Sequence, residues 1–197
     1  MSINIKLDGI EFMGDNFREN LKFCGSGVRL YPLAKMIRAE NAELDNNCQI
    51  FDNVFIDAGK RLRIGKYSTL TWGVLIEGGA ETYIGDRVFL GPSTKLLTST
   101  YKINGFYTVE HLPDGCQETE YGDITIHDDA YLGANCTVMP GITIGEGAVV
   151  GSNSLVTKDL EPWTVYFGTP CRKISMREKP DLEKNEKLKE VDWSNHL

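Results

Sequence analysis

Three histidines are the side chains of this 197-residue chain best suited to acid–base chemistry near neutral pH, because a free imidazole has a pKa of ~6.5. His111 lies in residues 102–123, which interrupt an otherwise regular sequence, and His196 lies in the tail. His127 directly follows an inward-facing aliphatic position and is expected to be structural. The pattern indicates His111 as a candidate general base, the alternative being a surface histidine without a role. Tyr101, a phenol with a pKa near ~10, is a candidate hydrogen-bonding wall.

The elements that must position these residues follow from a six-residue repeat. Isoleucine, leucine or valine recurs at every sixth place in three runs: Ile64, Leu70, Ile76; then Ile84, Leu90, Leu96; then Ile126, Leu132, Val138, Ile144, Val150, Val156. A period of six fits neither a helix nor an alternating strand, but it is typical of short strands joined by tight turns, three to a coil. A sandwich of short strands would not explain the fixed spacing. The sequence predicts an all-β fold, a parallel β-helix stabilised by stacking of its coils.

The repeat also predicts the domain organisation. Residues 44–174 form the β-helix, with 102–123 as a long projecting loop, because an insertion without hexads in a compact coil is usually functional. Residues 1–43 are an N-terminal capping region with a short helix, started by Asp15 or Asn16 and stopped by Gly25, and a weaker coil is possible within it. Residues 175–197 are a tail expected to be helical after Pro180.

Composition excludes several classes of function. The net charge of −7 argues against a nucleic-acid-binding protein, which would normally carry a basic face. The chain has no long apolar run and a polar N-terminus, so we expect no membrane association and a cytoplasmic location. The five cysteines are odd in number and form no CxxC pair, which favours neither a disulfide framework nor a zinc site. We expect no metal.

The segment 124–174, with VTKD at 156–159 and GTPCR at 168–172, resembles the hexapeptide-repeat acyltransferases. That family includes galactoside and maltose acetyltransferases and sugar acyltransferases of surface-polysaccharide pathways. The resemblance implies a left-handed coil, a homotrimer, and acyl transfer from acetyl-CoA, or a similar thioester, to a sugar. It also implies that donor and acceptor meet between neighbouring subunits, where the projecting loop helps to wall the acceptor pocket.

The same resemblance implies roles for individual residues. The backbones of Ala134 and Ser152 would line the channel for the pantetheine arm of CoA, and Thr157 and Lys158 would lie near one end of that channel. Arg172 would lie near the nucleotide phosphates, which need cationic partners. A second basic residue is expected three places after Arg172, where the chain has serine. Lys173 or Arg177 could replace it.

The chain departs from the galactoside and maltose enzymes where their specificity resides. The place of their catalytic histidine holds Tyr101, and the place of a sugar-binding asparagine holds Thr71, next to Trp72. Loss of that histidine favours transfer to an amine, which attacks a thioester with less help than a hydroxyl once positioned. Glu77 and the acids of the loop could then orient an ammonium group. Transfer to a hydroxyl, with His111 as base, stays open.

Three functions compete on this sequence. The first is acyl transfer to a hydroxyl or amine of a sugar. The second is a non-catalytic β-helix that binds partners, against which the intact VTKD and GTPCR segments argue. The third is a carbonic anhydrase of the γ type, which needs three zinc-binding histidines; the spacing of His111, His127 and His196 does not provide them.

Overall fold

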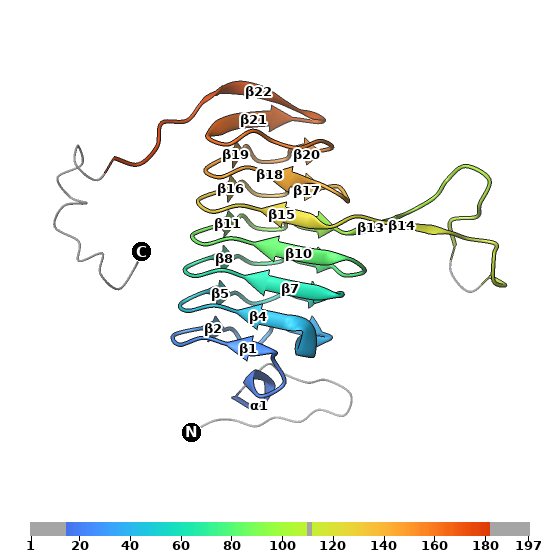
Figure 1. Ribbon diagram of the computed structural model, residues 1–197, viewed down its shortest axis with the longest axis horizontal. Coiled ribbons are helices and arrows are strands. Elements are labelled where there is room, and N and C mark those ends of the chain that lie inside the picture. The colour runs from blue at the N-terminus through green and yellow to red at the C-terminus, as the bar shows by residue number, and fades with distance from the viewer. Residues whose placement is uncertain (1–14, 110–111, 182–197) are drawn as a thin grey trace.

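The computed structural model describes residues 15–109 and 112–181, and it is a tall stack of coils with three flat faces (Figure 1). Each coil contributes one short strand to each face, so that strands from successive coils pair in parallel. We name the faces sheets 1, 2 and 3 in the order in which the chain visits them. The turns between them are corners 1–2, 2–3 and 3–1. The predicted β-solenoid is confirmed.

The strands of sheet 1 are β1 (Phe23–Cys24), β4 (Ala42–Leu44), β7 (Arg61–Ile64), β10 (Glu81–Ile84), β15 (Ile124–Ile126) and β18 (Thr143–Ile144). Sheet 2 contains β2 (Arg29–Leu30), β5 (Gln49–Ile50), β8 (Thr69–Leu70), β11 (Phe89–Leu90), β16 (Tyr131–Leu132), β19 (Val149–Val150), β21 (Thr164–Gly168) and β22 (Cys171–Met176). Sheet 3 contains β3 (Lys35–Ile37), β6 (Phe55–Asp57), β9 (Leu75–Glu77), β12 (Lys95–Leu97), β17 (Thr137–Val138) and β20 (Leu155–Val156).

The core is a set of aliphatic columns inside this prism. All twelve repeat positions predicted to point inward have side chains that are 0% exposed. They stack in register: Ile64 pairs with Ile84, Ile84 with Ile126, and Ile126 with Ile144. Burial of one such side chain contributes roughly 1.5–3 kcal/mol, and a single coil cannot bury its own column. The stacking of coils therefore carries the stability.

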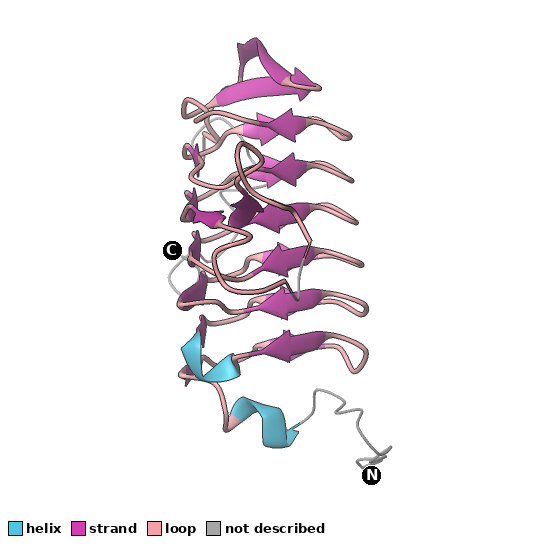
Figure 2. Ribbon diagram, turned by 90° about the vertical axis from the view of Figure 1, so that its right-hand side faces the viewer, coloured by secondary structure: helices cyan, strands magenta, loops and turns pink. Residues whose placement is uncertain are grey.

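The coils are longer below the loop than above it. Equivalent residues in adjacent coils are 20 positions apart at Arg63 and Tyr83, but 18 apart at Ala134 and Ser152. The difference lies at corner 3–1, which is wide after β9 and tight after β17. Between these levels the loop leaves the stack as an antiparallel pair, β13 (Ser99–Tyr101) and β14 (Thr119–Tyr121) (Figures 1 and 2). We call residues 99–121 the hairpin.

The ends of the solenoid differ from expectation. The N-terminal helix is a single turn, α1 (Asp15–Arg18), and the prediction that it continues to Gly25 is wrong. Phe23 instead pairs with Glu43 in sheet 1, so β1 to β3 form a complete coil before Leu44, where a weaker coil had seemed possible. A Cβ on Gly25 would lie 2.5 Å from Asn46 Oδ1, so close stacking of coils, rather than a helix stop, requires this glycine.

At the C-terminal end, β22 folds back on β21 and closes sheet 2. The helix expected after Pro180 falls at residues outside the described part of the chain. The only other helical element within residues 15–109 and 112–181 is a 3₁₀ turn, η1 (Ala39–Asn41). Across those same residues, no helix has the length and apolar character needed to cross a membrane.

Candidate functional site

A cleft of about 690 Å³ lies at corner 3–1, where the hairpin leaves the stack. Its walls come from the corners that follow β3 and β9 and from both strands of the hairpin. The lining residues are Arg38, Glu77, Gly78, Gly79, Ser99, Thr100, Tyr101, Gln117, Thr119 and Tyr121. The cleft therefore brings together Glu77 and Tyr101, two of the candidate residues identified in the sequence.

Two adjacent glycines shape the floor of the cleft. A Cβ on Gly78 would lie 2.5 Å from the carboxylate of Asp57, and a Cβ on Gly79 would lie 2.7 Å from the ring of Tyr121. Gly79 also has a φ of 142°, which side-chain-bearing residues rarely adopt. The glycine pair thus lets the charged group of the coil below and the aromatic ring of the hairpin approach the same turn.

The charged groups of the cleft are held from the coil side. Arg38 donates two hydrogen bonds to the carboxylate of Asp57, one of them 2.6 Å from Nε to Oδ1. Glu77 accepts a hydrogen bond from Ser99 Oγ at 3.0 Å, and its backbone oxygen accepts one from the buried hydroxyl of Thr98 at 2.6 Å. Because these contacts cross from coil to coil, the β-helix fixes where each charge lies.

The hairpin supplies the opposite wall. Tyr101 pairs with Thr119 across the two strands, and Tyr121 pairs with Ser99. Gln117 lines the cleft, and its Oε1 is buried without a hydrogen-bond partner. Such an unpaired buried oxygen typically costs about 1–3 kcal/mol unless a donor reaches it. His111 lies outside the described residues.

Thr71 and Trp72 lie at corner 2–3, and neither is among the residues that line the cleft. Thr71 is buried and donates its hydroxyl to the carbonyl of Leu90 at 2.7 Å, so this hydroxyl is committed to the fold. Trp72 is 53% exposed and packs edge-on against Phe51, whose ring stacks on Tyr31. The aromatic column occupies the lower coils of this corner.

The upper coils of corner 2–3 are polar and hold the residues expected to contact CoA. The Ala134 N–H donates to Ser152 Oγ at 3.1 Å, so these two residues are in contact in adjacent coils. Beside them, Asn135 donates to Asn153 at 2.9 Å. Arg172 lies on β22, where it pairs with Phe167 of β21, at the C-terminal end of the solenoid.

Thr157 and Lys158 lie at the other edge of sheet 3, where both are exposed. They follow Val156, which aligns with Val138 and, one coil further down, with Leu96. Lys158 therefore lies two strands above Thr98, roughly 10 Å along the stack. The cleft and Lys158 both lie at corner 3–1. The cleft lies below the hairpin, and Lys158 lies above it.

The two basic residues that could assist Arg172 already have partners. Lys173 Nζ lies 2.6 Å from Glu161, and this contact raises the pKa of Lys173 and lowers that of Glu161. Arg177 donates to the carbonyls of Asp129 and Gly147 at 2.9 and 3.0 Å. Each side chain therefore has part of its donor capacity already engaged within the fold.

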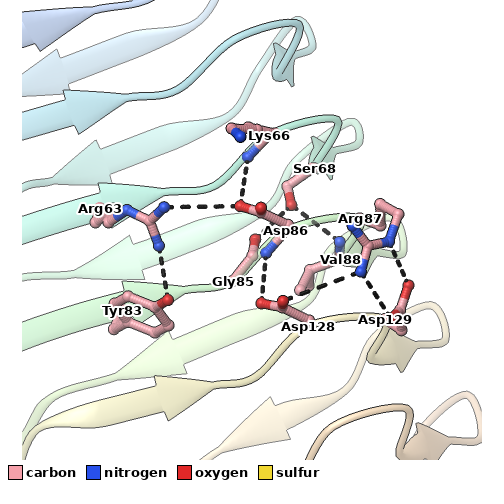
Figure 3. A network of polar contacts seen from close by, with 10 residues as sticks. All are labelled: Arg63, Lys66, Ser68, Tyr83, Gly85, Asp86, Arg87, Val88, Asp128 and Asp129. Atoms are coloured by element: carbon pink, nitrogen blue, oxygen red, sulfur yellow. Dashed lines mark hydrogen bonds and ion pairs between the residues drawn. The ribbon is translucent and has the colours of Figure 1, made fainter. Parts of the chain in front are cut away.

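A larger network of charges at corner 1–2 is structural (Figure 3). Lys66 donates its backbone N–H to Asp86, and Asp86 donates its own N–H to Asp128, each at 2.9 Å. Arg87 makes two hydrogen bonds to Asp129, at 2.7 and 2.9 Å. Asp86 and Asp128 thus satisfy turn amides of the coil below, which would otherwise lack partners, and Asp129 binds a side chain of the coil below.

Three of the five cysteines are buried thiols poorly suited to act as nucleophiles. Burial raises the pKa of the Cys48 thiol to about 12, and burial also raises the pKa values of Cys136 and Cys171. A thiol with a raised pKa stays protonated at neutral pH and reacts poorly. Among residues 15–109 and 112–181, no cluster of histidine, cysteine and acidic residues is arranged to hold a metal ion.

Sequence reasoning did not identify Arg38, Asp57, Gln117 or Tyr121 as site residues. One signal was available: Asp57 and Glu77 are 20 positions apart and each directly follows an inward isoleucine, so they share a column of the repeat. Nothing in the sequence indicates that Gln117 and Tyr121 return to the base of the hairpin, because that depends on how the loop folds.

The comparisons with known proteins agree with this architecture. Residues 123–158 match the family model described as bacterial transferase hexapeptide (six repeats). A probable macrolide acetyltransferase of Lysinibacillus sphaericus is 31% identical over 150 residues, covering 75% of this chain and 78% of that protein. The galactoside O-acetyltransferase of Escherichia coli is 30% identical over 150 residues, covering 76% of this chain and 70% of that enzyme.

Solved structures of related fold include the following two. A hexapeptide-repeat acetyltransferase from Vibrio cholerae, complexed with acetyl-CoA, has a TM-score of 0.56 at 27% identity and covers 83% of this chain and 75% of its own. AntD, an N-acyltransferase from Bacillus cereus in complex with dTDP and 3-hydroxybutyryl-CoA, has a TM-score of 0.76 at 24% identity, covering 85% and 90%. The repeat, the stacked coils and the extent of these matches show that the chain belongs to the hexapeptide-repeat acetyltransferases, a family whose solved structures include complexes with CoA and acetyl-CoA.

Proposed function

We propose that this enzyme transfers an acetyl or similar acyl group from CoA to a hydroxyl or amine of a sugar, and that the sugar binds in the cleft at the base of the hairpin. The observation that carries the proposal is the cleft itself, in which a carboxylate, Glu77, and a phenol, Tyr101, face a space of about 690 Å³. Such a space fits one sugar ring with several directional polar contacts. Surface-polysaccharide or nucleotide-sugar biosynthesis is the setting that we propose.

The donor would approach from the upper side of the hairpin. Ala134 and Ser152 would line the pantetheine arm, Thr157 and Lys158 would lie near one end of that channel, and Arg172 would bind the nucleotide phosphates. The polar upper half of corner 2–3 supports this placement, because amide and hydroxyl groups match the amides of pantetheine. Arg172 supports it as well, since its Nη1 donates to the adjacent carbonyl of Cys171 at 3.0 Å and the guanidinium has further donors for a phosphate.

The reaction needs the acceptor's nucleophile close to the thioester carbon. Attack forms the new C–O or C–N bond and breaks the C–S bond, and the departing thiolate takes up a proton. Positioning alone supplies much of the rate, because holding both reactants together removes the entropic cost of their encounter. In this scheme Tyr101 is a wall that hydrogen-bonds the acceptor, and the exposed Trp72, held next to the buried Thr71, would contribute from a neighbouring subunit.

A homotrimer with left-handed coils, as in the family, completes the proposal. The outer surface of sheet 3 carries half-buried apolar side chains: Phe55, Leu75, Leu97, Met139 and Leu155. Lys35, Lys95 and Thr137 share the same outward column, so this flat face mixes apolar and polar groups, as interfaces between subunits commonly do. Light scattering should give three times the monomer mass. Leu155→Arg should reduce it, whereas Thr143→Arg on the outer surface of sheet 1 should not.

The test of the function is a thiol-release assay with acetyl-CoA. The acceptors should include nucleotide-linked amino sugars, the matching hydroxyl sugars, free galactosides and a macrolide. Release that depends on a sugar supports the proposal. Release with the macrolide alone would contradict the sugar acceptor, and the absence of CoA binding by calorimetry would favour the alternative of a non-catalytic binding scaffold.

His111 separates the two chemistries. If the acceptor is a hydroxyl, a base must take its proton, and His111→Ala should lower kcat by roughly 10²–10⁴. If the acceptor is an amine, the same change should cost much less. A large loss with an amine acceptor would contradict unaided attack by the amine, and no loss with a hydroxyl acceptor would remove His111 as the base.

A further inference from the structure

Side chains of three successive coils form a hydrogen-bonded ladder at the upper half of corner 2–3. Lys95 Nζ donates to Asn135 Oδ1 at 3.0 Å, and Asn135 Nδ2 donates to Asn153 Oδ1 at 2.9 Å. Lys95 Nζ also donates to the carbonyl of Ser93 at 3.0 Å, which holds the ammonium group at the foot of the ladder. The hydrogen bonds therefore run in one direction, from Lys95 to Asn153.

The backbone places the two amides one above the other. The Asn135 N–H donates to the carbonyl of Pro92 at 2.7 Å, and the Asn153 N–H donates to the carbonyl of Ala134 at 2.8 Å. Both asparagines have positive φ values, 57° and 60°, in the left-handed region that asparagine tolerates better than most residues. Equivalent turns in adjacent coils thus bring the amides within hydrogen-bond distance.

The lysine sets the direction of this ladder. Two stacked asparagines alone can pair in either of two directions, because each amide carries a donor group and an acceptor group. An ammonium group only donates, so the atom of Asn135 that faces Lys95 must be its oxygen. The Asn135 nitrogen then faces Asn153 and requires an oxygen there. In the two coils below, the position of Lys95 holds Leu75 and Phe55, so the lysine occurs directly where the ladder begins.

The upper end of the ladder is a free donor. The Asn153 oxygen is engaged from below, and among residues 15–109 and 112–181 its Nδ2 has no hydrogen-bond partner. Thr169, in the turn between β21 and β22, donates to the backbone carbonyl of Asn153 at 2.9 Å and leaves the amide nitrogen unengaged. Asn153 follows Ser152 and is exposed. An oriented NH2 group at this place suits a ligand oxygen and disfavours a ligand N–H.

Resting on the proposed placement of CoA along this corner, we infer that Lys95 is a positioning residue for the acyl donor. It acts through Asn135 to hold Asn153 with its NH2 group outward, and Asn153 donates a hydrogen bond to an oxygen of CoA. That oxygen is a carbonyl of the pantetheine arm or belongs to a phosphate. No residue of the ladder takes part in the chemical step, so changes to the ladder should alter KM for acyl-CoA and leave kcat and the acceptor KM unchanged.

Reversal of the ladder is the first test. A carboxylate only accepts, so Lys95→Glu should turn the Asn135 nitrogen downward and leave the Asn153 oxygen outward. KM for acetyl-CoA should rise about tenfold or more, since a donor is lost and an unpaired oxygen takes its place. Lys95→Met permits both directions, so that about half of the molecules are competent and KM should rise roughly twofold. Lys35→Glu, the same change of charge on the same face three strands below, should leave KM unchanged.

A second variant separates positioning from a purely structural role. Asn153→Gly removes the amide at a position where glycine adopts the observed φ without strain, and it should raise KM for acetyl-CoA about tenfold. Lys95→Glu in the Asn153→Gly background should then add nothing, because no NH2 group is left to orient. Additive effects of the two changes, or an unchanged KM in Asn153→Gly, would overturn the inference. Light scattering and thermal unfolding check assembly and fold; if Lys95→Glu does not retain them, the same cycle is measured with Lys95→Met.

Two further measurements locate the contact and separate this inference from the proposed function. S-Acetylpantetheine has the carbonyls of the donor without its phosphates. An effect of Asn153→Gly that persists with this donor assigns the contact to a carbonyl, and an effect seen only with acetyl-CoA assigns it to a phosphate. In calorimetry with CoA, weaker binding to Arg172→Ala with unchanged binding to Asn153→Gly would overturn the role of the ladder and keep the donor site. No binding of CoA to the native enzyme would overturn both.

Discussion

The same corner of the solenoid has opposite character on the two sides of the hairpin. Below it, the residues that follow the inward isoleucines of β6 and β9 are Asp57 and Glu77, and the corner is wide and contains two glycines. Above it, the equivalent positions hold Met139 and Thr157, and the turn is short. A repeat that is uniform in its core therefore has different corners on the two sides of the hairpin: a wide one with two carboxylates below it and a tighter one with a methionine and a threonine at the same positions above it. In the function that we propose, the acceptor binds below the hairpin and the CoA donor above it.

Removal of the hairpin should have the largest effect: it should reduce acceptor-dependent activity while leaving CoA binding in place. Joining Lys102 to Glu118 through Asn-Gly retains the pairing of β13 with β14 and makes a favoured two-residue turn. The coils should still stack, because Ile84 pairs directly with Ile126 across the excursion. Acceptor-dependent thiol release should fall at least ~10²-fold because the acceptor is no longer positioned, with CoA affinity retained.

The measurements for this variant are thiol release, calorimetry with CoA and thermal unfolding. A melting temperature close to that of the native protein is the control that the solenoid is intact. Loss of CoA affinity in a folded variant would show that the donor depends on the hairpin too, and the two-sided division would be wrong.

Arg172→Ala tests the donor side alone. We expect KM for acyl-CoA to rise roughly ten- to a hundredfold, because a charge-assisted contact with phosphate contributes about 1.5–3 kcal/mol, while KM for the acceptor stays the same. Lys173→Ala is the matched control, since Lys173 is already paired with Glu161. An altered acceptor KM with an unchanged KM for acyl-CoA would place the nucleotide elsewhere.

The smallest expected effect on acceptor KM can be measured at two glycines, one on each side of the hairpin. Gly79, below the hairpin, and Gly141, above it, both have positive φ values, 142° and 79°. Alanine at either position should lower the free energy of unfolding by about 1–2 kcal/mol through backbone strain. Only the Cβ at Gly79 would meet the Tyr121 ring, at 2.7 Å; nothing lies within 4 Å of a Cβ at Gly141.

Gly79→Ala should therefore raise the acceptor KM, whereas Gly141→Ala should leave it unchanged. Denaturant unfolding measures the stability of both variants, and thiol release measures the KM values. If both variants alter acceptor KM equally, the effect comes from general strain in the coils rather than from Tyr121, and the cleft is not the acceptor site.

The sequence was sufficient to predict the solenoid, because its period directly reports the geometry of each coil. An inward aliphatic at every sixth position can bury its side chain only if the chain turns three times per coil, and all twelve positions are buried as predicted. The position of Glu77 beside the turn also follows from the repeat. The six-residue period does not constrain the conformation of residues 99–121 or of the ends of the stack. The N-terminal helix, predicted to extend to Gly25, is a single turn in the structure.

Only the tertiary structure decided which residues share the cleft. Arg38 and Asp57 come together because each coil returns the chain to the same corner one strand higher, so residues 19 positions apart form hydrogen bonds. Gln117 and Tyr121 join Glu77 because β14 pairs back on β13, and that register depends on cross-strand hydrogen bonds rather than on hydrophobic period. The sequence by itself determined the scaffold and the residues along each column. The walls of the cleft arise from contacts between neighbouring coils and from the pairing of the hairpin strands, which no local pattern encodes.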